Sequence, residues 1–227
     1  MLSNREVPNT AVIEVVSDVV CPWCFIGKRR LEKATALLGR KDVEVRWKAF
    51  QLNPNAPKEG MDRQTYRARK FGSAAYAKQL EARVVDAGAE EGIDFRFDQI
   101  ERVPNTFDAH RLIWLAGQEG VQNAVAENLF RAYFIDAEDI GRPVVLKRIA
   151  EESGLNSGRV EQLLNSDFGA SEVKAEELEA RTHGVDGVPT FFINGVPITS
   201  GAQKPELLAS VLGPALGQCS LEDGSCR

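Results

Sequence analysis

The sequence predicts an α/β fold in which a long helical segment interrupts a small sheet domain. Strand patterns occur only toward the two ends of the 227-residue chain, whereas helix-forming residues dominate from about residue 61 to 181. A Cys-x-x-Cys pair, Cys21 and Cys24, stands where the first strand gives way to the first helix. The two ends are therefore expected to build one domain around the inserted helices.

The N-terminal part has a strand–helix–strand order. An apolar run over residues 11–16 predicts the first strand, and a helical pattern covers residues 25–39. Strict alternation of apolar and polar residues over 43–50 indicates a half-buried second strand. A connection of this length predicts parallel strands with a right-handed crossover. Residues 53–57, rich in Asn and Pro, end the pattern as a linker.

The middle of the chain predicts four to six helices. Residues 105–108 (Asn-Thr-Phe-Asp) have the character of a capped helix start. The helices expected from periodicity cover residues 109–117, 125–134, 144–152, 160–164 and 171–182.

Strand patterns return near the C-terminus. Residues 188–193 and 196–198 flank Asn194-Gly195, a strong hairpin signal, and a last helix begins at Pro205. This order of elements is that of a thioredoxin fold interrupted in its middle. The predicted division is a discontinuous thioredoxin-like domain over 11–57 and 183–213, an all-helical insertion over 58–182, and a Cys-containing tail over 214–227.

The motif Cys21-Pro22-Trp23-Cys24 carries the predicted chemistry. A helix N-terminus stabilises a thiolate, and at such a position the pKa of a cysteine falls from ~8.5 to roughly 3.5–7.5. Cys21 is therefore the expected nucleophile, and Cys24, which faces inward, would resolve the mixed disulfide. Pro22 and Trp23 are candidate substrate contacts, because an aromatic ring between the thiols enlarges the apolar contact surface.

Composition excludes several classes of function. The net charge is −5, with 28 basic and 33 acidic residues mixed along the chain, which argues against a nucleic-acid partner. No apolar run approaches the roughly 18 residues of a membrane span, and residues 1–8 lack the apolar core of a secretory signal. A cytoplasmic location is expected, where a Cys-x-x-Cys pair is catalytic or metal-binding rather than structural. Both a monomer and a homodimer remain open.

The Cys motif, the helical insertion and the later segment Gly187–Phe191 together resemble the DsbA-like thioredoxin-fold oxidoreductases. Residues 105–112 and 201–203 are similar to its FrnE-like cytoplasmic branch, and the resemblance covers about residues 11–213. It implies a thiol–disulfide oxidoreductase or isomerase that acts on protein or small-molecule disulfides. It further implies no bound cofactor or metal, and glutathione or a thioredoxin system as the redox partner.

The resemblance also implies roles for three residues outside the motif. Val188-Pro189 would form a cis peptide bond facing the dithiol, with the Val188 backbone free to pair with an extended substrate chain. Glu14 would be a buried acid that passes protons to Cys24, the alternative being an outward-facing charge on the strand.

Other polar residues have less specific expectations. Asp18 is expected to face solvent or to cap the following helix, because its charge beside Cys21 would raise the pKa of that cysteine. His183 is expected at a surface helix end, with an approach to the thiol as the alternative. His110 is expected to be a packing or surface residue, with a polar role in the cleft as the alternative.

Other functions remain open at this point. Cys219 and Cys226 in the tail would form a second redox pair, a passive disulfide, or half of a zinc site with the first pair. The zinc reading would make the protein a non-catalytic metal-binding or redox-sensing one. A glutathione-dependent isomerase or transferase of the kappa or 2-hydroxychromene-2-carboxylate isomerase type is the other alternative. Such relatives typically carry Ser at the first motif position and lack the second Cys.

Overall fold

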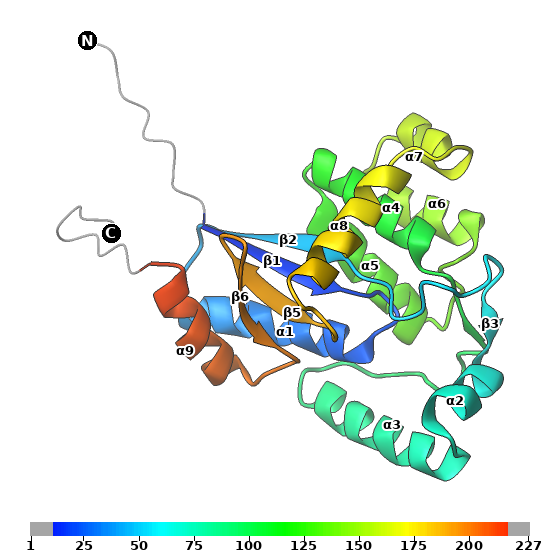
Figure 1. Ribbon diagram of the computed structural model, residues 1–227, viewed down its shortest axis with the longest axis horizontal. Helices are drawn as coiled ribbons and strands as arrows, with labels where there is room; N and C mark the ends of the chain where they lie inside the picture. Colours follow the sequence, from blue (N-terminus) through cyan, green and yellow to red (C-terminus); the bar gives the residue numbers. More distant parts are fainter. Residues whose placement is uncertain (1–10, 218–227) are drawn as a thin grey trace.

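The computed structural model describes residues 11–217, and its centre is a four-stranded mixed sheet (Figure 1). The strands follow the order β2-β1-β5-β6, comprising β2 (Val43–Ala49), β1 (Ala11–Ser17), β5 (Thr190–Ile193) and β6 (Val196–Ser200). Strand β1 pairs in parallel with β2 and antiparallel with β5. The sheet thus joins the two ends of the chain, which confirms the predicted α/β fold.

Both faces of β1 are covered, and its alternate residues enter different cores. Ile13 and Val15 pack in the main core with helices α1 (Pro22–Leu37) and α9 (Pro205–Ala215). Val16 packs in a smaller core on the other face, under helix α8 (Ala170–Thr182). This two-sided burial explains why the segment is a nearly continuous apolar run.

Seven helices lie between β2 and β5 in the part of the chain described, more than the four to six predicted. They are α2 (Arg63–Phe71), α3 (Ala74–Ala89), α4 (Phe107–Gln118), α5 (Gln122–Phe134), α6 (Pro143–Glu152), α7 (Ser157–Leu164) and α8. Neither α2 nor α3 is among the helices expected from periodicity. Helix α2 has no buried residue, whereas α3 buries Ala77 and Val84. Besides these helices and the loops between them, the insertion contains one short antiparallel ladder between β3 (Met61–Asp62) and β4 (Arg102–Val103). None of the helices within residues 11–217 is long and apolar enough to cross a membrane.

An aromatic cluster joins α1 to the insertion. Phe25 of α1 stacks on Phe130 of α5, with ring centroids 5.2 Å apart, and meets Phe95 edge-on at 6.2 Å. Phe134 contacts all three rings. The helix that carries the Cys motif is therefore fixed by contacts more than 60 residues away in the chain.

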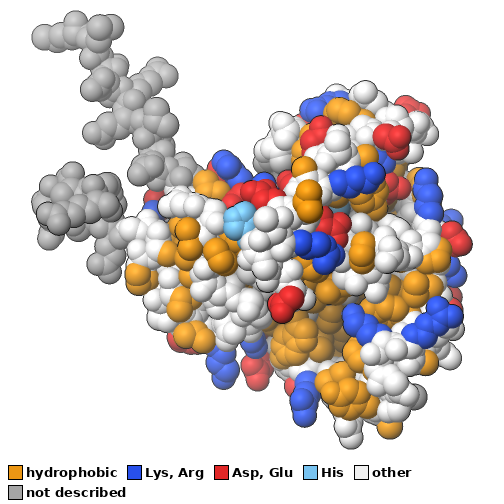
Figure 2. All heavy atoms as spheres, viewed as in Figure 1, with side chains coloured by type: hydrophobic (Ala, Val, Ile, Leu, Met, Phe, Trp, Pro, Cys, Tyr) orange, Lys and Arg blue, Asp and Glu red, His pale blue; other side chains and the backbone are white. Residues whose placement is uncertain are grey.

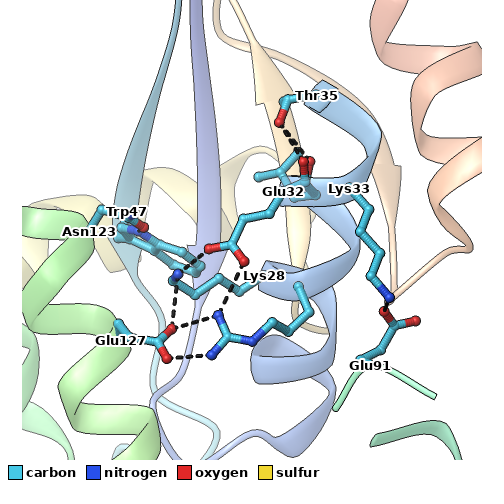
Figure 3. A network of polar contacts seen from close by, with 10 residues as sticks. Lys28, Glu32, Lys33, Thr35, Trp47, Glu91, Asn123 and Glu127 are labelled. Atoms are coloured by element: carbon cyan, nitrogen blue, oxygen red, sulfur yellow. Dashed lines mark hydrogen bonds and ion pairs between the residues drawn. The ribbon is translucent and has the colours of Figure 1, made fainter. Parts of the chain in front are cut away.

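Ion pairs also hold α1 to the insertion (Figure 3). The Lys28 side chain is only 4% exposed, and its Nζ lies 3.0 Å from a carboxylate oxygen of Glu127 on α5. Glu127 also pairs with Arg29, while Lys33 pairs with Glu91 at 2.6 Å. A buried lysine needs such a partner, because an unpaired buried charge is strongly destabilising.

Glu127 is expected to make folding stability fall with acidification. Burial alone would raise the pKa of Glu127, but hydrogen bonds from Arg29 and the charge of Lys28 lower it overall. The ionised Glu127 therefore stabilises the folded protein above its unfolded-state pKa, about 4.3. This stabilisation is lost as the pH falls through the lower folded-state pKa.

Urea unfolding between pH 7 and pH 3 of the wild type and Glu127→Gln measures this linkage. The variant should be less stable at pH 7 and lose less on acidification. Glu152→Gln, which removes an exposed partner of Arg148, is the control. Equal pH dependence in the wild type and Glu127→Gln would contradict the prediction.

Candidate active site

The Cys motif lies at the start of α1, immediately after β1. Helix α1 begins at Pro22, with Cys21 as its N-cap residue and no side chain capping this end. The Cys21 N–H donates to the Asp18 carbonyl at 3.0 Å, and the Cys21 carbonyl accepts from Cys24 N–H at 3.0 Å. The positive end of the α1 dipole is thus directed at the Cys21 position, as nucleophile activation requires.

The two thiols differ in environment. Cys21 is 5% exposed, Cys24 is fully buried, and both are free thiols. Trp23, between them, is 37% exposed on the surface. Burial raises the pKa of Cys24 well above its ordinary value, and contact with Cys21 adds to the increase. Cys21 is therefore the more exposed of the two thiols, and the environment of Cys24 favours its protonated form.

The segment before β5 lies against the outer thiol. The Val188-Pro189 bond is cis, as the resemblance implied, and the Cys21 thiol donates to the Val188 carbonyl at 3.6 Å. Gly201 N–H donates to the Pro189 carbonyl at 2.7 Å, which holds this segment to β6. The structure thus brings together parts of the chain separated by 167 residues.

Gly27 allows this segment to pack on α1. A Cβ at Gly27 would lie 2.9 Å from the Pro189 Cγ, which is closer than side chains pack. We expect Gly27→Ala to displace Pro189 from Cys21 and to lower disulfide turnover about ten-fold, because small misplacements of reacting groups are costly. Gly213→Ala, in α9, is the matched helical control, since its Cβ would meet only the flexible end of Leu38. Wild-type turnover in Gly27→Ala would contradict this prediction.

A cavity of about 430 Å³ opens beside the dithiol. Its walls come from the Cys motif on one side and from the insertion on the other, including Leu80, Val84, Phe97 and Tyr133. Figure 2 shows hydrophobic side chains gathered in the hollow between α1 and helices α2 and α3. The volume is that of a small-ligand pocket. The insertion therefore shapes the space in which a partner of Cys21 would lie.

The structure does not bring Glu14 or His183 to the dithiol. Glu14 lies on the α8 face of the sheet, half-buried, with an oxygen 3.5 Å from Lys48 Nζ. His183 is the exposed C-cap residue of α8, and its ring packs edge-on to Phe192 on the same face. The surface position expected for His183 is confirmed. The proton-passing role of Glu14 finds no support in this geometry.

The expectation for Asp18 is wrong. Its side chain is fully buried and caps no helix; instead it accepts from Leu52 N–H at 2.7 Å and Val20 N–H at 3.5 Å. His110 Nε2, from α4, lies 3.4 Å from the same carboxylate. The Asp18 carboxylate is thus turned inward, between Leu52 and helix α4 of the insertion. Sequence analysis missed this pair, and its only signals were the position of Asp18 beside the Cys motif and the 105–112 segment.

Two predicted site residues, Cys219 and Cys226, lie outside the described residues. Within residues 11–217, no cluster of three or more His, Cys, Asp or Glu side chains has the arrangement of a metal site.

The fold, with a Cys-x-x-Cys pair at the start of α1 beside a cis-proline, defines a thioredoxin-fold protein. The chain belongs to the DSBA-like thioredoxin domain family, which it matches over residues 12–213. A probable DsbA oxidoreductase from Streptomyces coelicolor is 32% identical, with a TM-score of 0.84 and 92% of each chain covered. The uncharacterized protein YwbO of Bacillus subtilis (strain 168) is 27% identical, over 86% of this chain and 92% of its own. A 2-hydroxychromene-2-carboxylate isomerase shares the fold at 17% identity and a TM-score of 0.68, covering 89% of this chain and 95% of its own.

Proposed function

We propose that this protein is a thiol–disulfide oxidoreductase in which Cys21 attacks and Cys24 resolves. The observation that carries the proposal is the position of Cys21. Its sulfur lies at the N-terminus of α1, where no side chain caps the helix, and 3.6 Å from the Val188 carbonyl. Cys24, in the first turn of the same helix, is fully buried. An outer reactive thiol backed by a buried one is the arrangement that thiol–disulfide exchange requires.

The reaction runs in two exchanges. The Cys21 thiolate attacks one sulfur of a substrate disulfide, the substrate S–S bond breaks, and one substrate thiolate leaves. Cys24 then attacks the Cys21 sulfur of the mixed disulfide, its proton is lost, and the second substrate thiolate leaves. The substrate gains two electrons and the protein becomes the Cys21–Cys24 disulfide. Glutathione or a thioredoxin system would restore the dithiol, and the reverse sequence oxidises a substrate.

The surroundings of Cys21 fit protein or small-molecule disulfides as substrates. An extended chain would pair with the backbone at Val188, whose carbonyl faces the reactive sulfur, and Pro189 fixes that segment. Pro22 and the exposed Trp23 line the adjoining cavity, which would hold the apolar part of the partner.

The isomerase alternative has the same fold, so only the Cys motif distinguishes it from an oxidoreductase. This chain keeps both cysteines, which favours dithiol exchange over chemistry that uses glutathione as the sole thiol. The zinc alternative would need Cys219 and Cys226 as further ligands to Cys21 and Cys24.

A glutathione redox titration of the purified full chain tests the proposal. All four cysteines are alkylated and mapped by mass spectrometry, before and after treatment with a chelator. We expect Cys21 and Cys24 to switch together at a potential between about −120 and −270 mV. Two results would contradict the proposal: thiols that resist exchange, or thiols protected by metal until the chelator is added. Turnover of a small electrophile with glutathione would favour the isomerase or transferase.

We also propose that Cys219 and Cys226 form a second redox couple that exchanges with the first. Replacing both by Ser should slow the re-reduction of the Cys21–Cys24 disulfide by glutathione, because one exchange route is lost. The rate is followed by alkylation at timed intervals. Unchanged turnover and an unchanged reduction potential of the first pair would rule the couple out.

We further propose that the protein belongs to the FrnE-like branch and is located in the cytoplasm. Cell fractionation tests the location. Size-exclusion chromatography with light scattering decides between monomer and homodimer.

A further inference from the structure

The cavity beside the dithiol is more positive than the chain as a whole. One acidic residue, Glu81, lines it together with four basic ones: Arg63, Arg67, Lys70 and Arg83. The chain itself has a net charge of −5. All five charged residues belong to helices α2 and α3, so the positive excess lies on the wall that the insertion contributes.

Two of these cations serve the fold. Arg63 Nη2 lies 3.0 Å from one carboxylate oxygen of Glu81, and Arg67 pairs with the other oxygen. The three side chains are only 16–22% exposed, and they link α2 to α3. These two arginines are therefore engaged in holding the two helices together.

Lys70 and Arg83, in contrast, are exposed and have no carboxylate partner within residues 11–217. Lys70 Nζ donates to the Tyr66 hydroxyl at 2.7 Å and lies 5.2 Å from the centre of the Tyr66 ring, which also lines the cavity. A hydroxyl and an aromatic ring orient the ammonium group but do not neutralise its charge. Both cations can therefore pair with a negative charge on a bound partner.

The rest of the cavity is apolar. Apart from Cys21, its remaining lining residues are aliphatic or aromatic, and they include Trp23, Leu80 and Val84. The volume of about 430 Å³ is in the range of pockets that enclose a small group. A partner that fills this space and also meets the two cations must carry both an apolar group and a negative charge.

We propose that the preferred partner is a peptide disulfide whose cysteine is flanked by apolar and acidic residues. The apolar side chain enters the cavity, and the carboxylate meets Lys70 and Arg83, so that the charges are complementary. A peptide is favoured over a small molecule because Val188, whose carbonyl faces Cys21, is not part of the cavity lining. Only an extended chain reaches both.

The inference rests on the proposed function and names the substrate class for the same site. The exchange is the one described above. The peptide disulfide gains two electrons and leaves as two thiols, and the protein becomes the Cys21–Cys24 disulfide.

The test compares matched peptide disulfides as oxidants of the reduced full chain in a Cys219→Ser/Cys226→Ser background. Each is a blocked Glu-Leu-Cys-Leu-Glu peptide linked to its own copy, or the same peptide with Gln or Lys in place of Glu, or with Gly in place of Leu. Oxidised glutathione is the small anionic disulfide. The second-order rate of oxidation is followed by alkylation at timed intervals in about 0.1 M salt, where the screening length is about 10 Å.

The variants each remove one positive charge. Lys70→Gln and Arg83→Gln remove the two cations that lack a carboxylate partner. Arg69→Gln on α2 and Lys78→Gln on α3 are the matched controls, because both residues are exposed on the same two helices and neither lines this cavity.

We expect the wild type to react about ten-fold faster with the Glu peptide than with the Gln peptide, and more slowly still with the Lys and Gly peptides. Lys70→Gln and Arg83→Gln should each lower the Glu-to-Gln ratio about three-fold, since one exposed ion pair is worth a factor of about two to five. The two controls should keep the wild-type ratio. About 1 M salt should remove most of the preference, because the screening length falls to about 3 Å.

Three results overturn the inference. The first is a wild-type protein that reacts with the peptides at equal rates. The second is an equal slowing of the Glu and Gln peptides in Lys70→Gln and Arg83→Gln, which shows that the cations act on the dithiol and not on the partner. The third is oxidised glutathione reacting faster than every peptide, with the same dependence on the two cations, which assigns them to a small molecule. A wild-type protein that none of these disulfides oxidises would instead overturn the proposed function itself.

Discussion

Cys21→Ser is expected to abolish disulfide exchange, whereas Cys24→Ser is expected to accumulate mixed disulfides. The reason is the different placement of the two sulfurs. Cys21 stands at the N-cap of α1 beside the Val188 carbonyl, so it alone meets a partner. Cys24 is fully buried beside Cys21, where an external disulfide does not reach it. Without Cys24 the first exchange proceeds and then stops.

Mass spectrometry of the protein treated with oxidised glutathione measures both effects. Cys24→Ser should carry one glutathione on Cys21, and Cys21→Ser should carry none on Cys24. The rate of exchange in Cys21→Ser should fall by at least about 10³-fold, because the buried thiol is both inaccessible and protonated. A Cys219→Ser/Cys226→Ser background removes adducts on the tail. Substantial turnover in Cys21→Ser would refute the assigned roles.

Phe130→Ala is expected to cost about 3–5 kcal/mol of folding stability, the usual range for truncating a buried aromatic ring. Phe130 is fully buried in α5, stacked on Phe25 at 5.2 Å and edge-on to Trp47 at 5.9 Å. Its loss would leave a cavity where α1, the sheet and the insertion meet. Because Phe25 follows Cys24 directly, the positions of the two thiols should also become less uniform, and with them the rate at which the dithiol reacts.

Equilibrium urea unfolding measures this cost. Val144→Ala, at a position 62% exposed, is the control and should change stability by less than about 0.5 kcal/mol. Phe130→Leu should fall between the two. A loss below about 1 kcal/mol for Phe130→Ala would mean that the aromatic cluster is not the principal contact between α1 and the insertion.

Local pattern predicted those elements whose burial follows a regular period. The alternation over 43–50 marked β2, and the long apolar run marked β1, which is covered on both faces. Helices α2 and α3 went unrecognised; α2 has no buried residue, and α3 buries Ala77 and Val84, which are seven positions apart. Side chains alternate between the two faces of a strand, so the sequence already places Glu14 on the opposite face of β1 from Ile13 and Val15. The alternation does not predict which of these two faces lies against α1.

By itself, the sequence determined the order of elements in the sheet domain and the dithiol at the start of α1, because each depends on a local pattern of residues. It also gave the family resemblance, because the motifs that carry it are short runs of residues. The family resemblance implied that Val188 and Pro189 face the dithiol, but only the tertiary structure decided how Asp18 and His110 lie relative to each other. Asp18 meets His110 across 92 residues, and Cys21 meets Val188 across 167. The first contact forms where the insertion packs over the β1–α1 loop, and the second where the segment before β5 meets α1; no periodicity records either. The free energy of that packing depends on both partners at once, so neither segment alone reveals it.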